Sequence, residues 1–517
     1  MTTPVSDRTA TPVPERPGGG DARVTGRGRT DTVIVLLAAL VAAAAWLPFL
    51  DRPLTADESG FLMVAEQWQP GRSLYGDYWV DRPPLLLWLF TIAGYLGSVE
   101  ATTSGLVAPG LKVLGAVAGG LSVALTGVLA SLVSPGSRPT LLTTVVLAAA
   151  LVSSPLLGMP AVNGELLAVP LVLLGLVCAV TAMRGPWGWR TAVLAAAAGA
   201  SGMAAALVKQ NFIDVFVFTA VLVAISHPHV PRLWARAATF AGGAAASLGA
   251  AVAGAGAQGT SVPELWDAVV VFRTHAADLI EASASSATAA RGVQLVTASL
   301  GSGVAVVLVI AVAAVVARRS PLALPVLAMT AWELVAIAAG GSYWLHYLTG
   351  IVPGLVLLVA TAGFDPARRS GLALRSAVAY AVVAALVVWT LVALAPPQQT
   401  PESRVSTYLR EHAHPSDGVV VGFGHPEIIA ASGLDSPYEN LWSLPARVRD
   451  PHLTHLHSVL AGGSAPRWVV VDGDSLDTWG LDGDHAQQYL RRHYVERVSY
   501  DDWHIWQRRS TSVTVRR

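Results

Sequence analysis

The sequence predicts a polytopic α-helical membrane domain followed by a small α/β domain. Apolar runs of about 17–25 residues recur between residues 31 and 394, and a helix of that length crosses a bilayer core of roughly 30 Å. The chain is 53% hydrophobic and only 13% charged, too few charges for the surface of a water-soluble protein of 517 residues. After about residue 396 the composition becomes polar, which predicts the second domain.

About eleven runs qualify as membrane spans, with a range of eleven to thirteen: 31–50, 110–133, 139–157, 164–183, 190–208, 210–226, 234–256, 296–317, 320–340, 347–363 and 371–394. Every second connecting loop carries arginine, as cytoplasmic loops do: Arg138, Arg184, Arg190, Arg232, Arg236, Arg318, Arg319, Arg368, Arg369 and Arg375. This alternation predicts a multi-pass protein of the plasma membrane, with a cytoplasmic N-terminus and an exterior C-terminal domain.

One apolar segment, 83–97, is too short for a crossing, and counting it as a span would place Arg138 outside. We interpret it as an exterior juxtamembrane helix that starts at Pro83 and Pro84, where missing N–H donors cost nothing. The loop 257–295 is a second exterior region, and its pattern predicts an interfacial amphipathic helix.

The two ends of the chain differ from the middle. Residues 1–30 are rich in Pro, Gly, Thr and Arg, which predicts a disordered cytoplasmic tail before a membrane domain at 31–396. Residues 397–517 predict an exterior α/β domain, with strands at 418–423 and 467–473, helices at 401–413 and 484–494, and a final strand pair. The formal net charge is zero, which excludes an electrostatic case for nucleic-acid binding.

Asp57 and Glu58 form an acidic pair a few residues beyond the first span. A carboxylate there can accept a proton from an acceptor hydroxyl or help to hold a divalent cation such as Mg²⁺ or Mn²⁺. The alternative is an N-terminal helix cap, because acids are stabilising at the start of a helix. The sequence leaves both interpretations open.

Further acids and cations occur at other exterior turns. Asp81 and Arg82 directly precede two prolines. An aromatic belt at the membrane interface explains the tyrosines and the tryptophan before them, but it does not explain this charged pair. Glu165 opens a span, where it also suits the helix dipole. The chain has two lysines, Lys112 and Lys209, and both lie at or inside spans, where charge is expensive.

Lys209 and Gln210 interrupt two apolar runs, and a lysine there can hold a phosphate, although a snorkelling interfacial lysine is the alternative. His346 and Tyr347 begin a late span, where a histidine can bind phosphate or sugar or belong to an interfacial belt. Three histidines at 452, 455 and 457 have metal-like spacing but no accompanying cysteine, so we assign no metal site.

The predicted topology places these groups on one side of the membrane. These groups include a base that can accept the proton of a hydroxyl and cations that can stabilise a phosphate leaving group, at a lipid–water boundary. Together they predict glycosyl transfer from a lipid phosphate. No cofactor is certain, and a divalent cation is possible.

The order of these motifs resembles the GT-C class of membrane glycosyltransferases, over roughly residues 31–360. An acid after the first span is followed by Tyr-x-Asp-x-x-x-Asp-basic-Pro-Pro, as in the protein O-mannosyltransferase and aminoarabinose transferase group. The resemblance implies a polyprenyl-phosphate sugar donor and a catalytic acid in the first exterior loop. It implies these roles: Asp57 as catalytic acid with Glu58 beside it, Glu165 and Asp81 as acceptor- or metal-positioning acids, and Lys209, Lys112, Arg82, Gln210, His346 and Tyr347 at the donor phosphate.

The leading hypothesis is therefore an inverting glycosyltransferase that modifies an envelope glycan, glycolipid or protein at the exterior face. A transporter or flippase of lipid-linked saccharides also fits many spans with charges, but it predicts charges near the bilayer midplane. A third alternative is an envelope assembly protein whose exterior domain binds glycans.

Overall fold

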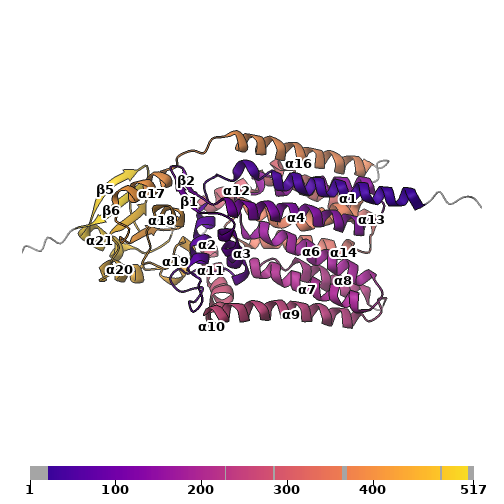
Figure 1. The fold of residues 1–517 in the computed structure, drawn as a ribbon, viewed down its shortest axis with the longest axis horizontal. Helices are drawn as coiled ribbons and strands as arrows, with labels where there is room; N and C mark the ends of the chain where they lie inside the picture. Colours follow the sequence, from indigo (N-terminus) through magenta and orange to yellow (C-terminus); the bar gives the residue numbers. More distant parts are fainter. Residues whose placement is uncertain (1–20, 228, 283–285, 364–368, 478–479, 510–517) are drawn as a thin grey trace, which may run out of the picture.

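The computed structural model describes residues 21–227, 229–282, 286–363, 369–477 and 480–509. Figure 1 shows a bundle of long helices lying side by side, with the C-terminal domain at one end of it. The bundle consists of α1 (Asp21–Ala44), α4 (Pro109–Val133), α5 (Arg138–Val152), α6 (Gly164–Arg184), α7 (Trp189–Val208), α8 (Asp214–Ser226), α9 (Leu233–Gln258), α12 (Ser286–Gly301), α13 (Val304–Arg318), α14 (Ala323–Ala339), α15 (Val352–Ala362) and α16 (Arg369–Leu394).

The multi-pass membrane architecture is confirmed. Seven helices in the described ranges are long and apolar enough to span a membrane, and a bent pair, α12 with α13, makes up to eight. The expected spans at 139–157, 210–226 and 320–340 correspond to shorter apolar helices, α5, α8 and α14. Of the tail predicted to be disordered at 1–30, residues 1–20 lie outside the described part of the chain, whereas residues 21–30 are helical and belong to α1.

The prediction of one continuous span at 296–317 is wrong. Helices α12 and α13 meet at an angle of 63° across Ser302 and Gly303. Gly303 has φ 79°, a left-handed conformation that ends a helix and that glycine adopts without steric cost. A Cβ at this position would lie 3.0 Å from Cδ1 of Tyr380, so the bend also lets α16 approach closely.

Short elements lie between the bundle and the C-terminal domain (Figure 1). They are α2 (Ala56–Gln67), α3 (Pro84–Tyr95), the hairpin β1 (Glu100–Thr102) and β2 (Gly105–Val107), α10 (Val262–Trp266), a π-helical turn (Asp267–Val271), α11 (Phe272–Ala282) and the 3-10 segment η4 (Leu345–Ile351). Helix α3 is the predicted juxtamembrane helix, and it begins at Pro84 as expected. The helix predicted within 257–295 corresponds to α10, the π-helical turn and α11, which follow one another without a break from Val262 to Ala282.

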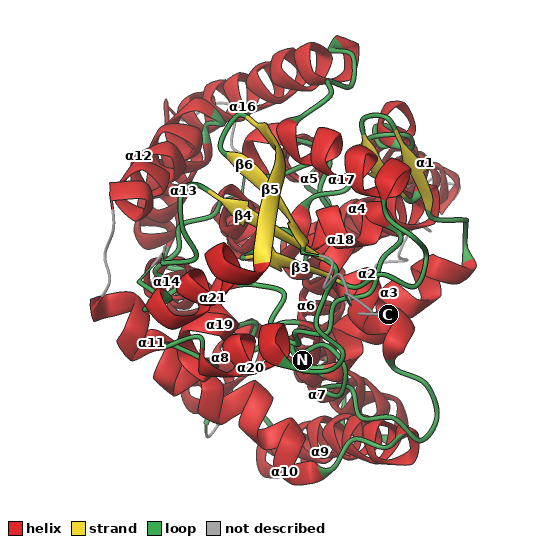
Figure 2. Cartoon of the chain, turned by 90° about the vertical axis from the view of Figure 1, so that its left-hand side faces the viewer, coloured by secondary structure: helices red, strands yellow, loops and turns green. Residues whose placement is uncertain are grey.

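The C-terminal domain is a mixed four-stranded sheet with helices, as predicted (Figure 2). Its strand order is β3-β4-β6-β5, with β3 and β4 parallel and the other pairs antiparallel. The elements are α17 (Pro401–His412), β3 (Val419–Gly422), α18 (Pro426–Ser432), α19 (Ser443–Arg449), α20 (Thr454–Ala461), β4 (Trp468–Asp472), α21 (Asp484–His493), β5 (Tyr494–Tyr500) and β6 (Trp503–Arg508).

Side chains of the central strands alternate between two cores. Val419 and Val421 belong to the core that is continuous with the membrane bundle, whereas Val420 belongs to a separate core beneath α20 and α21. Because successive strand residues face opposite sides, a strand buried on both faces reads as an unbroken valine run. The shared core fixes one face of the C-terminal domain against the membrane domain.

Candidate active site

A cavity of about 850 Å³ lies at the junction of the bundle and the C-terminal domain. Its walls come from α2, the loop before α3, the first turn of α6, the α7–α8 turn, α11, α12, α14, η4 and α19. Eight of the ten site residues predicted from the sequence line it: Asp57, Asp81, Arg82, Glu165, Lys209, Gln210, His346 and Tyr347. These eight residues, which are up to 290 positions apart in the sequence, are thus brought to one cavity.

Asp57 reaches the cavity because its neighbours form the helix cap. Thr55 Oγ1 accepts the backbone N–H of Glu58, and Glu58 Oε2 accepts the backbone N–H of Thr55 at 2.9 Å, which completes a capping box. Asp57 lies between these residues in the first turn. Its Oδ1 accepts a hydrogen bond from the indole N–H of Trp442 at 3.0 Å, while Oδ2 receives none from the described residues. Both acids therefore lie at the start of the helix, as the cap interpretation predicted, but only Glu58 forms a capping hydrogen bond.

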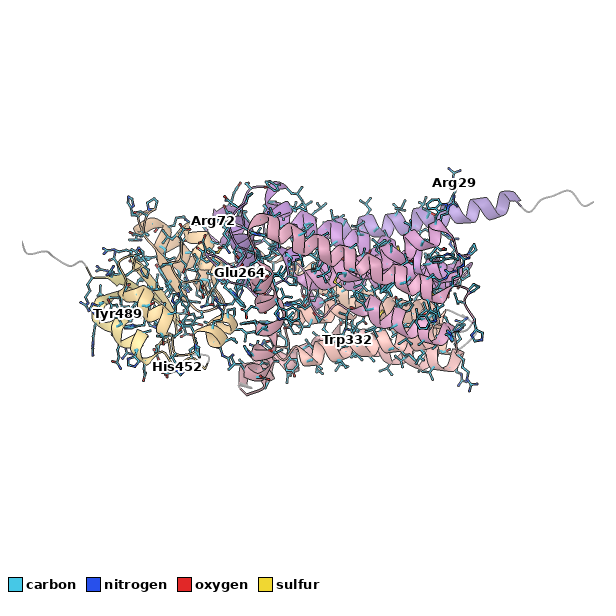
Figure 3. The ribbon with its side chains drawn as sticks, turned by 90° about the horizontal axis from the view of Figure 1, so that it is seen from below. Arg29, Arg72, Glu264, Trp332, His452 and Tyr489 are labelled. Carbon is cyan, nitrogen blue, oxygen red and sulfur yellow. The ribbon has the colours of Figure 1, made fainter. Side chains whose placement is uncertain are left out.

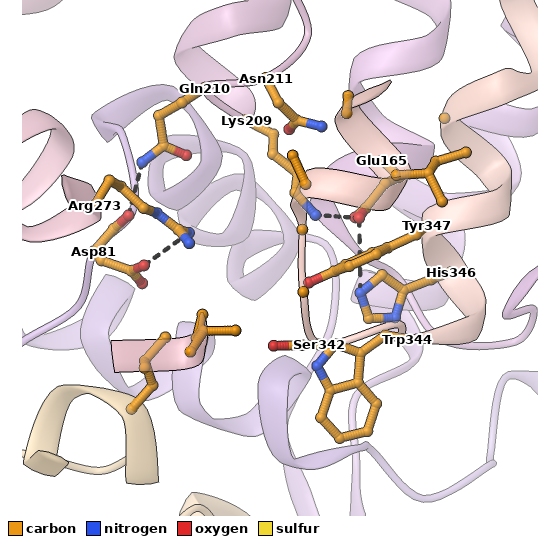
Figure 4. Close-up of a pocket in the computed structure, with 18 of the residues that line it drawn as sticks. Asp81, Glu165, Lys209, Gln210, Asn211, Arg273, Ser342, Trp344, His346 and Tyr347 are labelled. Atoms are coloured by element: carbon orange, nitrogen blue, oxygen red, sulfur yellow. Dashed lines mark hydrogen bonds and ion pairs between the residues drawn. The ribbon is translucent and has the colours of Figure 1, made fainter. Parts of the chain in front are cut away.

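Asp81 joins two guanidinium groups on one side of the cavity. Oδ1 lies 2.6 Å from Nη1 of Arg82. Oδ2 lies 2.7 Å from Nη2 of Arg273, and Figure 4 shows this pair. Burial acts to raise the pKa of Asp81, but the charges of Arg273 and Arg82 outweigh burial and hold it below its usual value. Gln210 donates to the backbone carbonyl of Asp81 at 2.9 Å, which ties this loop to the α7–α8 turn.

Glu165 holds a second cluster opposite the first (Figure 4). Asn163 caps α6 by accepting the N–H of Leu166, so Glu165 falls in the first helical turn. It forms an ion pair with Lys209, and Nε2 of His346 lies 3.7 Å from the same carboxylate oxygen. Only 15% of the Lys209 side chain is exposed, which rules out a snorkelling lysine in this structure.

Aromatic and glycine residues position the second cluster. The ammonium of Lys209 lies 4.8 Å from the ring centre of Tyr347, within cation–π distance. Gly158 has φ 105°, and a Cβ there would lie 2.8 Å from the Cβ of His346. Glycine at this position therefore lets η4 approach the loop before α6 closely enough for His346 to face Glu165.

Glu58 and Lys112 do not line the cavity, which corrects their expected roles. Nζ of Lys112 lies 2.6 Å from Oε1 of Glu58, and the two side chains are 1% and 0% exposed. Glu58 Oε1 also accepts the N–H of Val162 at 2.8 Å, and Lys112 donates to the carbonyl of Pro160 at 2.9 Å. The pair joins α2, α4 and the loop before α6, so it supports the elements around the cavity.

Among the cavity residues that were not predicted from the sequence, Arg273 and Trp442 contact predicted site residues directly. Arg273 is a basic residue inside the apolar stretch VVVFRTHAA of a segment predicted to lie at the interface. A charged residue in an apolar stretch indicates a functional or paired position, because charged residues near the membrane are rare without a partner. Trp442 carried no sequence signal, since its role depends on how the C-terminal domain docks.

In the described ranges, no group of three or more His, Cys, Asp or Glu residues is arranged to hold a metal ion. The carboxylates of Asp81 and Glu165 instead contact cationic side chains. In the C-terminal domain, His452 lies 3.1 Å from Asp482 in an exposed pair.

Solved structures with a similar fold are membrane transferases. The chain superimposes on ArnT from Cupriavidus metallidurans bound to undecaprenyl phosphate with a TM-score of 0.60 and 11% identity, over 94% of this chain and 99% of ArnT. It superimposes on the archaeal oligosaccharyltransferase AglB from Archaeoglobus fulgidus, in complex with an inhibitory peptide and a dolichol-phosphate, with a TM-score of 0.54 and 13% identity, over 94% of this chain and 75% of AglB.

No protein-family model matches the sequence, and no curated protein matches it. The likeness is therefore one of fold, and it extends over the membrane bundle and the C-terminal domain together. The chain has the fold of the GT-C membrane glycosyltransferases.

Proposed function

We propose that the chain is an inverting glycosyltransferase that takes a sugar from a polyprenyl-phosphate donor and transfers it to a cell-envelope acceptor at the exterior face. The observation that carries the proposal is the cavity, which brings the carboxylate of Asp57 together with the cations Arg82, Lys209 and Arg273. An anionic phosphate and a nucleophilic hydroxyl are the two groups that such an arrangement suits.

The donor would place its phosphate among the cations. Arg82 and Arg273 are held by Asp81, and Lys209 is held by Glu165, so their charges are oriented before a ligand arrives. Preorganised cations in a site shielded from water stabilise charge that develops on a leaving phosphate. Val335, Ala336 and Ile337 of α14 line the same cavity and give the first isoprene units an apolar surface. ArnT in complex with undecaprenyl phosphate supports this donor class.

The acceptor hydroxyl would lie beside Asp57. As its oxygen bonds to the anomeric carbon, the bond from that carbon to the phosphate oxygen breaks, and Asp57 takes the hydroxyl proton. Attack from the face opposite the phosphate inverts the anomeric configuration. The phosphate leaves with the electron pair of the broken bond and remains among the three cations.

The test is a transfer assay with the purified full chain in lipid nanodiscs. The donor is the radiolabelled polyprenyl-phosphate sugar fraction extracted from a strain that lacks the chain, and the acceptor is the envelope of that strain. Label that moves to the envelope, with the anomeric configuration inverted in the product, is the expected result. Movement of the labelled lipid across a proteoliposome membrane with no transfer product would instead identify a transporter.

A further inference from the structure

The indole of Trp442 joins the C-terminal domain to the carboxylate proposed as the base. Trp442 lies directly before α19, and its Nε1 donates to Oδ1 of Asp57 at 3.0 Å. The two residues are 385 positions apart in the chain. Because an indole N–H only donates, it cannot itself take the acceptor's proton.

Helix α2 is shaped to receive this ring. A Cβ at Gly60 would lie 2.3 Å from Cζ2 of Trp442 and 2.8 Å from Cγ of Pro426, so the indole rests on the helix backbone where a side chain is missing. The ring of Phe61 lies 5.5 Å from the indole, centre to centre. Gly60 and Phe61 therefore fix the ring from the side of the membrane domain.

The hydrogen bond distinguishes the two oxygens of Asp57. Oδ1 is held by Trp442, whereas Oδ2 accepts no hydrogen bond from the described residues. A base whose orientation is fixed by a third group is the arrangement that proton-transfer catalysis requires, because a small misplacement of the base costs rate.

We infer that Trp442 is a positioning residue for the reaction, through which the docked C-terminal domain orients Asp57 toward the acceptor hydroxyl. This inference rests on the proposed function. It makes the C-terminal domain part of the catalytic unit, in addition to any role in binding the acceptor.

The experiment compares Trp442→Phe with Gly60→Ala, in the transfer assay described above with the donor fraction titrated. Trp442→Phe keeps an aromatic ring and removes the N–H, whereas Gly60→Ala displaces the ring and leaves the N–H intact. Both variants should lose roughly 5- to 50-fold in maximal rate, with the donor KM within about twofold of wild type. Gly94→Ala, at a position in α3 with open space around it, is the matched control and should keep the full rate.

Thermal unfolding of each variant separates positioning from folding. Trp442→Phe should unfold at the wild-type temperature while its maximal rate falls. A wild-type maximal rate in Trp442→Phe, a raised donor KM with an unchanged maximal rate, or a loss of rate that follows a loss of stability would each overturn the inference. The proposed function fails separately, if Asp57→Asn retains full transfer activity.

Discussion

Asp81 and Glu165 each contact two basic side chains at the wall of the cavity. Asp81 lies between Arg82 and Arg273, and Glu165 contacts Lys209 with His346 nearby. A carboxylate shared by two cations orients both of them and offsets their repulsion. At the residue scale, these acids therefore orient the cations that would hold a phosphate. The sequence had suggested instead that they position the acceptor or a metal ion.

Arg273 is the cavity cation best placed for a direct test, because its removal leaves Asp81 paired with Arg82. Arg273→Ala should weaken the binding of undecaprenyl phosphate about 10- to 100-fold, since a hydrogen bond to a charged group contributes about 1.5–3 kcal/mol. Titration of the lipid into the protein in nanodiscs measures this. Arg273→Lys, which keeps the charge, should recover part of the affinity, and wild-type binding by Arg273→Ala would remove Arg273 from the donor site.

Lys112 should matter for stability and not for donor binding. Lys112→Met leaves the carboxylate of Glu58 buried without its cation, and breaking a buried ion pair in this way costs about 3–5 kcal/mol. We expect a clear fall in the unfolding temperature, with undecaprenyl phosphate bound normally by the protein that remains folded. The double variant Glu58→Gln with Lys112→Met should regain part of the lost stability, because no charge is then left unpaired. A stable Lys112→Met protein with weakened lipid binding would restore the role first expected of Lys112.

Much of the site could be predicted from residue type and sidedness. Eight of ten predicted residues line the cavity, because charges near membrane spans are costly and persist where they have a use. The sequence could not show that Lys112 and Lys209 have different roles, since both are lysines at the ends of predicted spans. Which lysine faces the cavity depends on packing between helices that are far apart in the sequence. The same limit explains why Trp442 was missed.

At the scale of elements, α7 and α9 pack through small residues. A Cβ at Gly199 would lie 1.9 Å from the carbonyl oxygen of Phe240, and a Cβ at Gly243 would lie 2.0 Å from that of Ala196. Within a membrane, helices associate through such close backbone approach, because lipid supplies no hydrophobic driving force between them.

Gly243→Ala should therefore separate α7 from α9. We expect it to destabilise the protein, with a cost similar to other overpacked sites, about 1–3 kcal/mol. Gly249→Ala on the same helix has open space around it and should be neutral or stabilising, since alanine favours a helix by about 1 kcal/mol over glycine. Thermal unfolding of the two variants side by side measures the difference. Equal stability of both variants would show that this contact does not hold the helices together.

The charge of the loops and the length of the apolar runs predicted which elements are present more accurately than they predicted where each element begins and ends. The juxtamembrane helix α3 was separated from the spans because a further crossing would have inverted every later basic loop. The bend between α12 and α13 was missed because Gly301, Ser302 and Gly303 lie inside one long apolar run. In the C-terminal domain, the valine runs predicted β3 and β4. The contact of α18 with α2 could not be predicted, because neither segment alone shows that the two helices meet.

At the scale of the whole molecule, the arginine-bearing loops gather at one end of the bundle. Arg138 lies 3.2 Å from Asp31, Arg184 donates to the carbonyl of Leu132, and Arg318 donates to the carbonyl of Ala362. Figure 3 shows Arg29 at the end of the bundle opposite His452 and Tyr489 of the C-terminal domain. Basic loops mark the cytoplasmic side, so we propose that the cavity and the C-terminal domain face the exterior.

Cysteine labelling tests this orientation, because the chain has a single native cysteine, Cys178, which is buried. In a Cys178→Ala background, His452→Cys should react with a membrane-impermeant maleimide in intact cells. Pro186→Cys, in the exposed loop between α6 and α7, should react only after the cells are permeabilised. The opposite pattern would place the cavity on the cytoplasmic side.

The central claim is that Asp57 is the base of a glycosyl transfer from a lipid phosphate, and the variant Asp57→Asn tests it most directly. The asparagine keeps the size of the side chain but cannot take a proton, so donor binding should stay within about twofold while the maximal transfer rate falls about 10²–10⁴-fold. Asp51→Asn, at an exposed acid shortly before α2, is the control and should retain the full rate. Both quantities are measured on one preparation, by titration with undecaprenyl phosphate and by transfer of radiolabelled sugar to the envelope acceptor. Transfer by Asp57→Asn at the wild-type rate would contradict the account.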